Sequence, residues 1–202
     1  ELKQAGTYKV KDIESRVSGG ASVLNKYTDF ILSANTGPRN NLTATGAVDR
    51  GVDNIKVYLP RPELAVVYGN NVTITWENDP SLKPYEVVFK SMFGDELSTT
   101  ETNSNSVVIN LNDKDFENED NIIVIVYSKS NRAKASDEYT LKKLSKADKE
   151  RIRNLYSEIA AQTAEQTAFN KFLIAGFYEE NNLLIDAMPY FQEAIKLAPD
   201  VQ

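Results

Sequence analysis

The sequence predicts an α+β protein in which a sandwich of short antiparallel strands is followed by three helices. Two patterns carry this prediction. Between Asn71 and Tyr127, short apolar or alternating runs are separated by turn residues, as in a two-layer β-domain. From Ser145 onward, apolar residues recur with the spacing of an amphipathic helix.

Four segments form the expected centre of the sandwich. Val72–Glu77 alternates between apolar and polar residues, which predicts a strand with one buried and one wet face. Ile122–Tyr127 is apolar throughout, as expected of a strand that is buried on both faces. Tyr85–Phe89 and Ser106–Leu111 lie between them, and each is bounded by turn residues.

Weaker strands flank this centre. Ile55–Leu59 ends at two prolines, which cannot donate to a strand ladder and therefore predict an edge strand. The other flanking predictions are a continuation of that strand over Leu64–Tyr68, an edge strand over Thr99–Thr102, and a last strand over Ala135–Leu141.

The region 52–144 resembles an immunoglobulin-like or fibronectin-type-III-like sandwich. Trp76 lies on an early strand, Tyr85 opens the third, and Val124–Tyr127 lies near the end. The absent cysteine pair does not match antibody-type domains. The resemblance implies a fold and not an activity, because this fold serves many functions.

Three helices are expected over about 145–163, 166–180 and 185–197. Ser145 and Asp148 have the spacing of a capping box, with Asp in place of the usual Glu. Ala198-Pro199-Asp200 predicts the stop of the third helix.

The last two helices resemble one tetratricopeptide repeat. Small residues alternate with large apolar ones where that motif brings its helices close together. The sequence departs from the motif at Lys171, where an aromatic residue is usual, and at Pro189, which falls early in the second helix. The matching positions are Ile174, Ala175, Tyr178, Ala187, Phe191, Ala194 and Pro199.

Residues 1–51 are predicted to be a separate N-terminal segment. Val23, Leu24, Tyr27, Phe30 and Ile31 follow helical spacing and predict a short amphipathic helix. Residues 36–51 are rich in Asn, Thr and Gly and predict an extended linker. The resulting division is 1–51, 52–144 and 145–202.

Composition restricts the chemistry and the partners. A net charge of −6 and a pI near 4.9 disfavour nucleic acid and anionic lipid as partners. No apolar run reaches the roughly 20 residues of a membrane-spanning helix. The absence of Cys and His removes thiolate and imidazole chemistry, including most metal sites. The chain opens at Glu1 without Met, which is consistent with trimming or with a removed targeting peptide.

The densest acidic run, 113–120, has two interpretations. Alternating acids at Asp113, Asp115 and Glu117 resemble a calcium loop, but Asn118 and Val124 stand where that loop needs Gly and Glu. The favoured interpretation is a solvated connection between strands, with Phe116 against the rim of the core. We therefore expect no metal site and no cofactor.

The strand Ile122–Tyr127 carries apolar residues on both faces, so one face needs a cover. Ile123, Ile125 and Val88 would otherwise expose a patch of the kind that monomers avoid. We expect the helix over 145–163 to dock on this outer face. The alternative covers are the N-terminal helix near Tyr27 or another protein.

These observations favour a non-catalytic interaction or scaffold module of a periplasmic or cell-surface protein. Its partner would be another protein or a peptide, and no catalytic residue is assigned. The alternatives are a carbohydrate- or ligand-binding accessory module, in which Trp76 and tyrosines line a sugar site, and a carboxylate-based hydrolase. The candidate interaction residues are Phe177, Tyr178, Phe191, Ile123 and Ile125.

Overall fold

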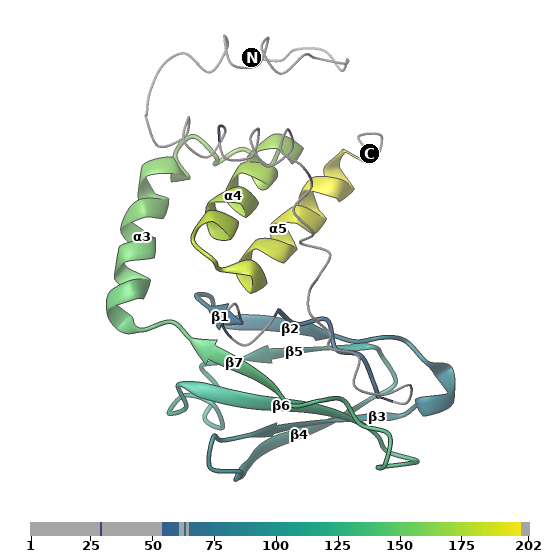
Figure 1. Cartoon of the computed structure of the whole chain (residues 1–202). Coiled ribbons are helices and arrows are strands. Elements are labelled where there is room, and N and C mark those ends of the chain that lie inside the picture. Colours follow the sequence, from purple (N-terminus) through teal and green to yellow (C-terminus); the bar gives the residue numbers. More distant parts are fainter. Residues whose placement is uncertain (1–28, 30–53, 61–62, 64, 199–202) are drawn as a thin grey trace.

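The computed structural model describes residues 29, 54–60, 63 and 65–198 (Figure 1). From residue 65 to residue 198, strands come first and three α-helices follow, which confirms the predicted α+β class. The predicted N-terminal helix and linker lie outside the described residues, apart from Asp29. The elements are β1 (Val66–Val67), β2 (Asn71–Thr75), the 3-10 turn η2 (Pro80–Leu82), β3 (Tyr85–Lys90), β4 (Glu96–Thr102), β5 (Ser106–Asn110), β6 (Asn121–Ser128), β7 (Tyr139–Lys143), α3 (Lys146–Ala160), α4 (Ala168–Glu180) and α5 (Leu184–Leu197).

The strands form two sheets. One has five strands in the order β1-β7-β6-β3-β4, and the other pairs β2 with β5. All neighbours are antiparallel except β1, which runs parallel to β7. The strand predicted weakly at Thr99–Thr102 is the edge strand β4, and it begins earlier than predicted. The last strand is shifted toward the C-terminus, and Ala135 makes only an isolated bridge with Tyr127.

The segment before β1 adds a third, irregular strand to the small sheet. Val57 forms a bridge with Trp76, and the Tyr58 N–H donates to the Thr75 carbonyl at 2.8 Å. The prediction that Leu64–Tyr68 continues this strand is wrong, because Val66 and Val67 pair with β7 in the other sheet. Crossing to the second sheet lets the chain cover the free edge of β7.

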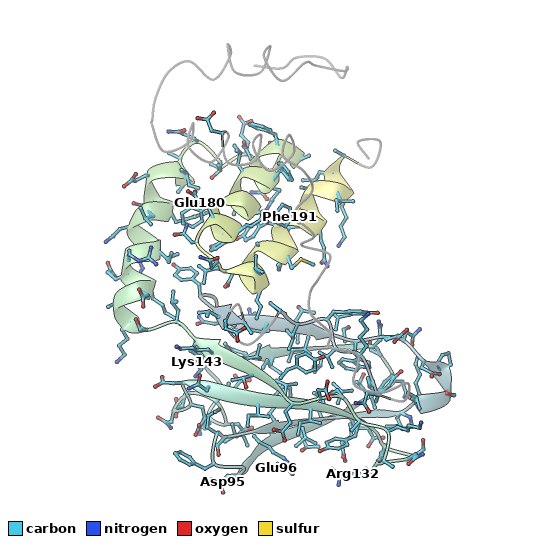
Figure 2. All side chains as sticks on the ribbon, in the orientation of Figure 1. Asp95, Glu96, Arg132, Lys143, Glu180 and Phe191 are labelled. Atoms are coloured by element: carbon cyan, nitrogen blue, oxygen red, sulfur yellow. The ribbon has the colours of Figure 1, made fainter. Side chains whose placement is uncertain are left out.

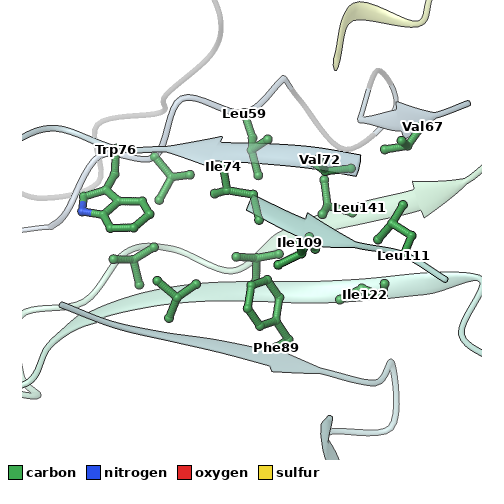
Figure 3. Packing of buried hydrophobic residues seen from close by; sticks show 14 of the residues in the cluster. Leu59, Val67, Val72, Ile74, Trp76, Phe89, Ile109, Leu111, Ile122 and Leu141 are labelled. Carbon is green, nitrogen blue, oxygen red and sulfur yellow. The ribbon is translucent and has the colours of Figure 1, made fainter. Parts of the chain in front are cut away.

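The core lies between the two sheets, as the alternating patterns predict (Figure 3). Val72, Ile74 and Trp76 point inward from one sheet and are almost fully buried. The facing side chains come from alternate positions of β3 and β6 and from β7. They are Tyr85, Val87, Phe89, Ile122, Val124, Val126 and Leu141.

Two aromatic pairs fix the ends of this core. The rings of Trp76 and Tyr85 meet edge to face, with centroids 5.4 Å apart. Trp76 is fully buried, which confirms its predicted place in the core. Phe116 meets Phe89 in the same way, also at 5.4 Å. The loop before β6 is therefore attached to the core through one aromatic side chain.

The helices do not cover the outer face of the five-stranded sheet, so the predicted docking position is wrong. Their apolar cluster contacts the sandwich through Val66, Tyr68 and Leu144. These residues lie in and next to β1 and just beyond the end of β7. Figure 1 shows the helices stacked beyond the β1 edge, away from β3 and β4.

Val88 and Ile125 on the outer face are nevertheless only 1% and 3% exposed. The register places Val88 opposite Ile125, and Glu86 opposite Tyr127, on the same face. The Arg132 guanidinium lies 4.9 Å from the centroid of the Tyr127 ring. Long side chains of this kind bury apolar surface beneath their stems.

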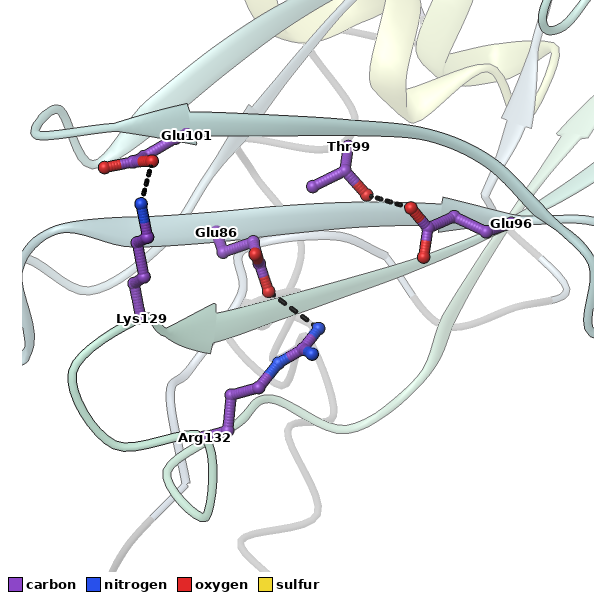
Figure 4. A network of polar contacts seen from close by, with 6 residues as sticks. All are labelled: Glu86, Glu96, Thr99, Glu101, Lys129 and Arg132. Atoms are coloured by element: carbon purple, nitrogen blue, oxygen red, sulfur yellow. Dashed lines mark hydrogen bonds and ion pairs between the residues drawn. The ribbon is translucent and has the colours of Figure 1, made fainter.

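Ion pairs hold these long side chains over the sheet (Figure 4). Arg132 lies 2.7 Å from the Glu86 carboxylate, and Lys129 pairs with Glu101 on the neighbouring strand. Glu86 and Glu101 are direct partners across β3 and β4. These polar side chains lie on the same face of the sheet as the buried pair Val88 and Ile125.

Side-chain caps begin two of the helices. The Ser145 hydroxyl accepts from the Asp148 N–H at 3.1 Å and donates to the Asp148 carboxylate at 2.6 Å, which confirms the predicted cap of α3. Thr167 accepts from the Asn170 N–H at the start of α4. Asn182, with φ of 58°, turns the chain between α4 and α5.

The helices pack through small residues and through a cluster of aliphatic and aromatic side chains. Ala175, Ala187 and Ala194 are buried, which lets α4 and α5 approach closely. Pro189 lies inside α5 just past its first turn, so only one helical donor is lost. The buried members of the cluster are Ile152, Ile159, Ile174, Phe177, Tyr178, Leu183 and Ala187.

Phe116→Ala should lower the free energy of unfolding by about 3–5 kcal/mol, because it removes a buried ring and leaves a cavity beside Phe89. Urea unfolding followed by Trp76 fluorescence measures this change. Phe93→Ala is the control, since the Phe93 side chain is 93% exposed. Equal effects of the two substitutions would contradict the assignment of Phe116 to the core.

Candidate interaction surfaces

Asp186, in the first turn of α5, joins the helices to the sandwich. Its carboxylate accepts hydrogen bonds from the backbone N–H of Tyr68 at 2.8 Å and of Gly69 at 2.7 Å. Both donors lie in the short connection between β1 and β2. We call this arrangement the Asp186 clamp. It satisfies two backbone donors with one carboxylate and fixes where α5 begins relative to the sandwich.

The clamp leaves no room for a side chain at residue 69. A Cβ added to Gly69 would come within 2.9 Å of the Asp186 Oδ1 atom. Burial raises the pKa of Asp186, and the hydrogen bonds from Tyr68 and Gly69 oppose that rise. The position at the start of a helix also favours the negative charge.

A group of aromatic rings surrounds Tyr178 next to the clamp. Its ring centroid lies 6.0 Å from that of Tyr68, 6.2 Å from Tyr156 and 5.5 Å from Tyr190. Burial, followed by the neighbouring Tyr190 and Asp186, raises the pKa of Tyr178 far above its ordinary value. The Tyr178 hydroxyl therefore stays protonated, and the rings act as packing between α3, α4, α5 and β1.

The structure separates the predicted interaction residues into two groups. Phe177, Tyr178 and Phe191 belong to the helical cluster, whereas Ile123 and Ile125 lie on β6 of the five-stranded sheet. Phe177, Tyr178 and Ile125 are buried. Phe191 and Ile123 are half-buried, so they retain surface that a partner can reach.

Sequence reasoning missed an apolar stripe along α5. Met188 is 54% and Ile195 is 67% exposed, and they follow one side of the helix with half-buried Leu184 and Phe191. We call these four residues the α5 seam. Figure 2 labels Phe191 on this helix. The signal was present in the sequence, because the spacing of four, three and four residues is that of a helix–helix seam.

A pocket of about 440 Å³ opens at one end of the sandwich. Asp79 caps the turn η2 there, and hydrogen bonds from the Ser81 side chain and backbone lower the pKa of Asp79. No aromatic residue lines this pocket, and Trp76 is buried in the core. The lining residues are Asn54, Ile55, Glu77, Asn78, Asp79, Pro80, Ser81, Leu82 and Lys134.

The acidic run connects β5 to β6 as a series of turns. The Phe116 and Glu117 N–H groups both donate to the Asp113 carbonyl at 2.8 Å, and Phe116 points into the core. Among the described residues, no group of three or more acidic side chains is placed to hold a metal ion. None of the helices in the described ranges is both long and apolar enough to cross a membrane.

No protein-family model matches the sequence, and neither does any curated protein. Two solved structures show a limited likeness. One is the Arg-specific cysteine proteinase gingipain R (RgpB), at 14% identity and a TM-score of 0.31, with 45% of this chain and 18% of that chain covered. The other is the complex of Porphyromonas gingivalis RgpB pro- and mature domains, at 14% identity and a TM-score of 0.30, with coverage of 45% and 19%. The match spans less than a fifth of either structure's chain.

Gly69→Ala and Asp186→Ala should be strongly non-additive. Alone, each should lower the free energy of unfolding by about 1–3 kcal/mol, because the two backbone donors of the clamp lose their acceptor. In the Asp186→Ala background, Gly69→Ala should cost much less, since the atom that its Cβ meets is gone. A urea-unfolding double-mutant cycle measures this coupling. Additive effects would contradict the clamp.

Asp186 should also make stability depend on pH. Burial raises its folded-state pKa above 3.8, so folding favours the protonated carboxyl. The contribution of the protonated Asp186 carboxyl to the free energy of unfolding is complete below the unfolded-state pKa. It is lost as pH rises through the folded-state pKa. The stability of the wild type relative to Asp186→Asn should therefore fall across that window in urea titrations. A relative stability that rises with pH would contradict this sign; Asp113→Asn, at an exposed site, is the control.

Proposed function

We propose that the protein is a non-catalytic interaction module in which an immunoglobulin-like sandwich carries a tetratricopeptide-like helical pair. The observation that carries the proposal is the α5 seam, where Met188 and Ile195 are exposed on either side of Phe191, whose ring packs on Phe172 of α4. Its partner would be another protein, and the module would belong to a periplasmic or cell-surface protein, as the composition favours.

The strand arrangement supports the immunoglobulin-like assignment. In that fold the second and fifth strands share one sheet, and the third, sixth and seventh share the other. Here β2 pairs with β5, while β3, β6 and β7 lie side by side in the larger sheet. The strand β4 joins the larger sheet next to β3.

The packing of α4 on α5 supports the tetratricopeptide-like assignment. Ala175, Ala187 and Ala194 are buried at the positions where that motif uses small residues. Lys171 replaces the usual aromatic residue. Its ammonium group lies 2.6 Å from Glu193 and 5.4 Å from the ring centroid of Tyr190, so it still links α4 to α5.

The α5 seam fits one class of occupant, an amphipathic helix of a partner protein. Met188 and Ile195 are two turns apart, and Phe191 lies between them. Side chains with this spacing interlock with the apolar stripe of a second helix. Helical repeats of the tetratricopeptide type bury such faces by stacking on a neighbouring helix.

The alternatives have less support. A sugar site needs an exposed aromatic platform, and the pocket at the sandwich end is lined by polar and aliphatic residues. Hydrolysis by paired carboxylates needs a buried acid that faces a cleft. Asp186 is a part-buried acid with a raised pKa, but both of its oxygens accept backbone hydrogen bonds.

Ile195→Glu should disrupt binding at the α5 seam, because it places a charge in the middle of an apolar contact. The amount of protein that the chain retains from an envelope fraction should fall about tenfold or more. Quantified pull-downs with wild type and variant measure this loss. Val108→Glu is a matched control, because Val108 is 65% exposed and lies on β5, outside the helical segment. Equal retention by Ile195→Glu, or binding of glycans with no protein retained, would contradict the proposal.

A further inference from the structure

The β3–β4 hairpin presents an apolar tip to solvent. Phe93 is 93% exposed and its neighbour Met92 is 53% exposed. These are adjacent large apolar side chains at the end of a hairpin, where they contribute little to the core. A single exposed apolar residue is ordinary, but an adjacent pair at a projecting tip offers a compact area to bury on binding.

The tip is held by a dense set of hydrogen bonds. Ser91 is only 3% exposed, and its hydroxyl accepts from the N–H groups of Phe93 at 3.1 Å and Asp95 at 3.2 Å. The Ser91 N–H donates to the Asp95 carbonyl at 2.8 Å. Gly94, with φ of 92°, takes the left-handed position that the turn requires. The apolar pair is therefore presented in one conformation, which lowers the entropy cost of binding.

Negative charge surrounds the tip. Asp95 and Glu96 adjoin it and are exposed, as Figure 2 shows at the lower rim of the sandwich. Lys90 at the end of β3 is opposite Ile123 near the start of β6, so the acidic run 113–120 enters at this same end of the sheet. Most of its acids are exposed, and the bases beside them are fewer: Lys90, Lys114, Lys142 and Lys143.

We propose that this hairpin tip, residues 91–95, docks into an apolar surface flanked by basic side chains on a partner protein. Phe93 and Met92 would be buried in the complex, while the surrounding acids pair with the basic rim. Complementary charge speeds the encounter and excludes acidic surfaces, anionic lipid included. This inference does not depend on the α5 seam, which lies on the helical segment.

The test uses the intact chain and two synthetic amphipathic peptides. One contains only leucine and lysine, and the other has glutamate in place of lysine. Isothermal titration should show binding of the lysine peptide alone. Phe93→Ala should weaken it about ten- to hundredfold, the range expected for losing one buried aromatic side chain. Asp115→Asn with Glu117→Gln should weaken it further and reduce its salt dependence.

Two controls separate the tip from other apolar surfaces. Phe169→Ala removes an aromatic side chain that is 39% exposed on α4, and Ile195→Glu disrupts the α5 seam. Phe169→Ala should bind the lysine peptide like the wild type, and the loss caused by Phe93→Ala should be the same in the Ile195→Glu background, where the α5 seam cannot hold the peptide. Unchanged binding by Phe93→Ala in either background, or an equal loss in Phe169→Ala, would overturn the proposal.

Other occupants of the tip have their own tests. Vesicles of phosphatidylcholine and phosphatidylglycerol test a membrane surface, and sedimentation velocity at rising concentration tests a second copy of this chain. We expect neither vesicle binding nor self-association. Vesicle binding or self-association that disappears in Phe93→Ala would overturn the proposed class of partner.

Discussion

The placement of the helical segment depends on a part-buried carboxylate at the start of α5. Removing Asp186 from water is costly, and the chain offsets that cost with two backbone donors, at 2.7 and 2.8 Å, and with the favourable end of a helix. Gly69 is part of the same constraint, because its missing side chain leaves the space that the carboxylate fills. The clamp, together with the apolar contacts of Val66, Tyr68 and Leu144, sets the orientation of α5, and α4 follows through its close packing on α5.

This constraint decides which surfaces remain available. The helices meet the sandwich at the β1 edge, so that edge of the larger sheet is covered. The outer face of β3 and β6 carries ion-paired long side chains, and the three C-terminal helices pack elsewhere. Among the described residues, the exposed apolar features include the α5 seam and the hairpin tip at residues 91–95. They lie on different parts of the molecule, which suits a module that contacts more than one surface.

Local patterns in the sequence predicted most of the elements and little of their assembly. Alternation identified β2 and the burial of Trp76, and the Ser145–Asp148 spacing identified the start of α3. The docking position failed for a physical reason. Ile125 and Val88 are buried without one of the three C-terminal helices over them, and their face carries Arg132 with its ion pair to Glu86, which no apolar pattern reveals.

Contacts between distant residues were also beyond the sequence. The Asp186 clamp joins residues that are 117 and 118 positions apart, and nothing local marks Gly69 as the partner of an acid. Val66 pairs with β7 because the chain leaves the small sheet after Leu59 and joins the larger one. In the sequence, Pro60 and Pro62 indicate that the first strand ends, but not where the chain goes next. Among the surface features, the α5 seam was readable from its spacing, whereas the exposure of Phe93 depended on where the β3–β4 turn ends.

The most direct test of the central claim is whether the helices and the sandwich form one rigid body. Residual dipolar couplings of the backbone amides in β6 and α5 measure this in solution. The Asp186 clamp predicts that a single alignment tensor fits both elements in the wild type, and that two tensors are needed in Asp186→Ala. Separate tensors in the wild type would contradict the account.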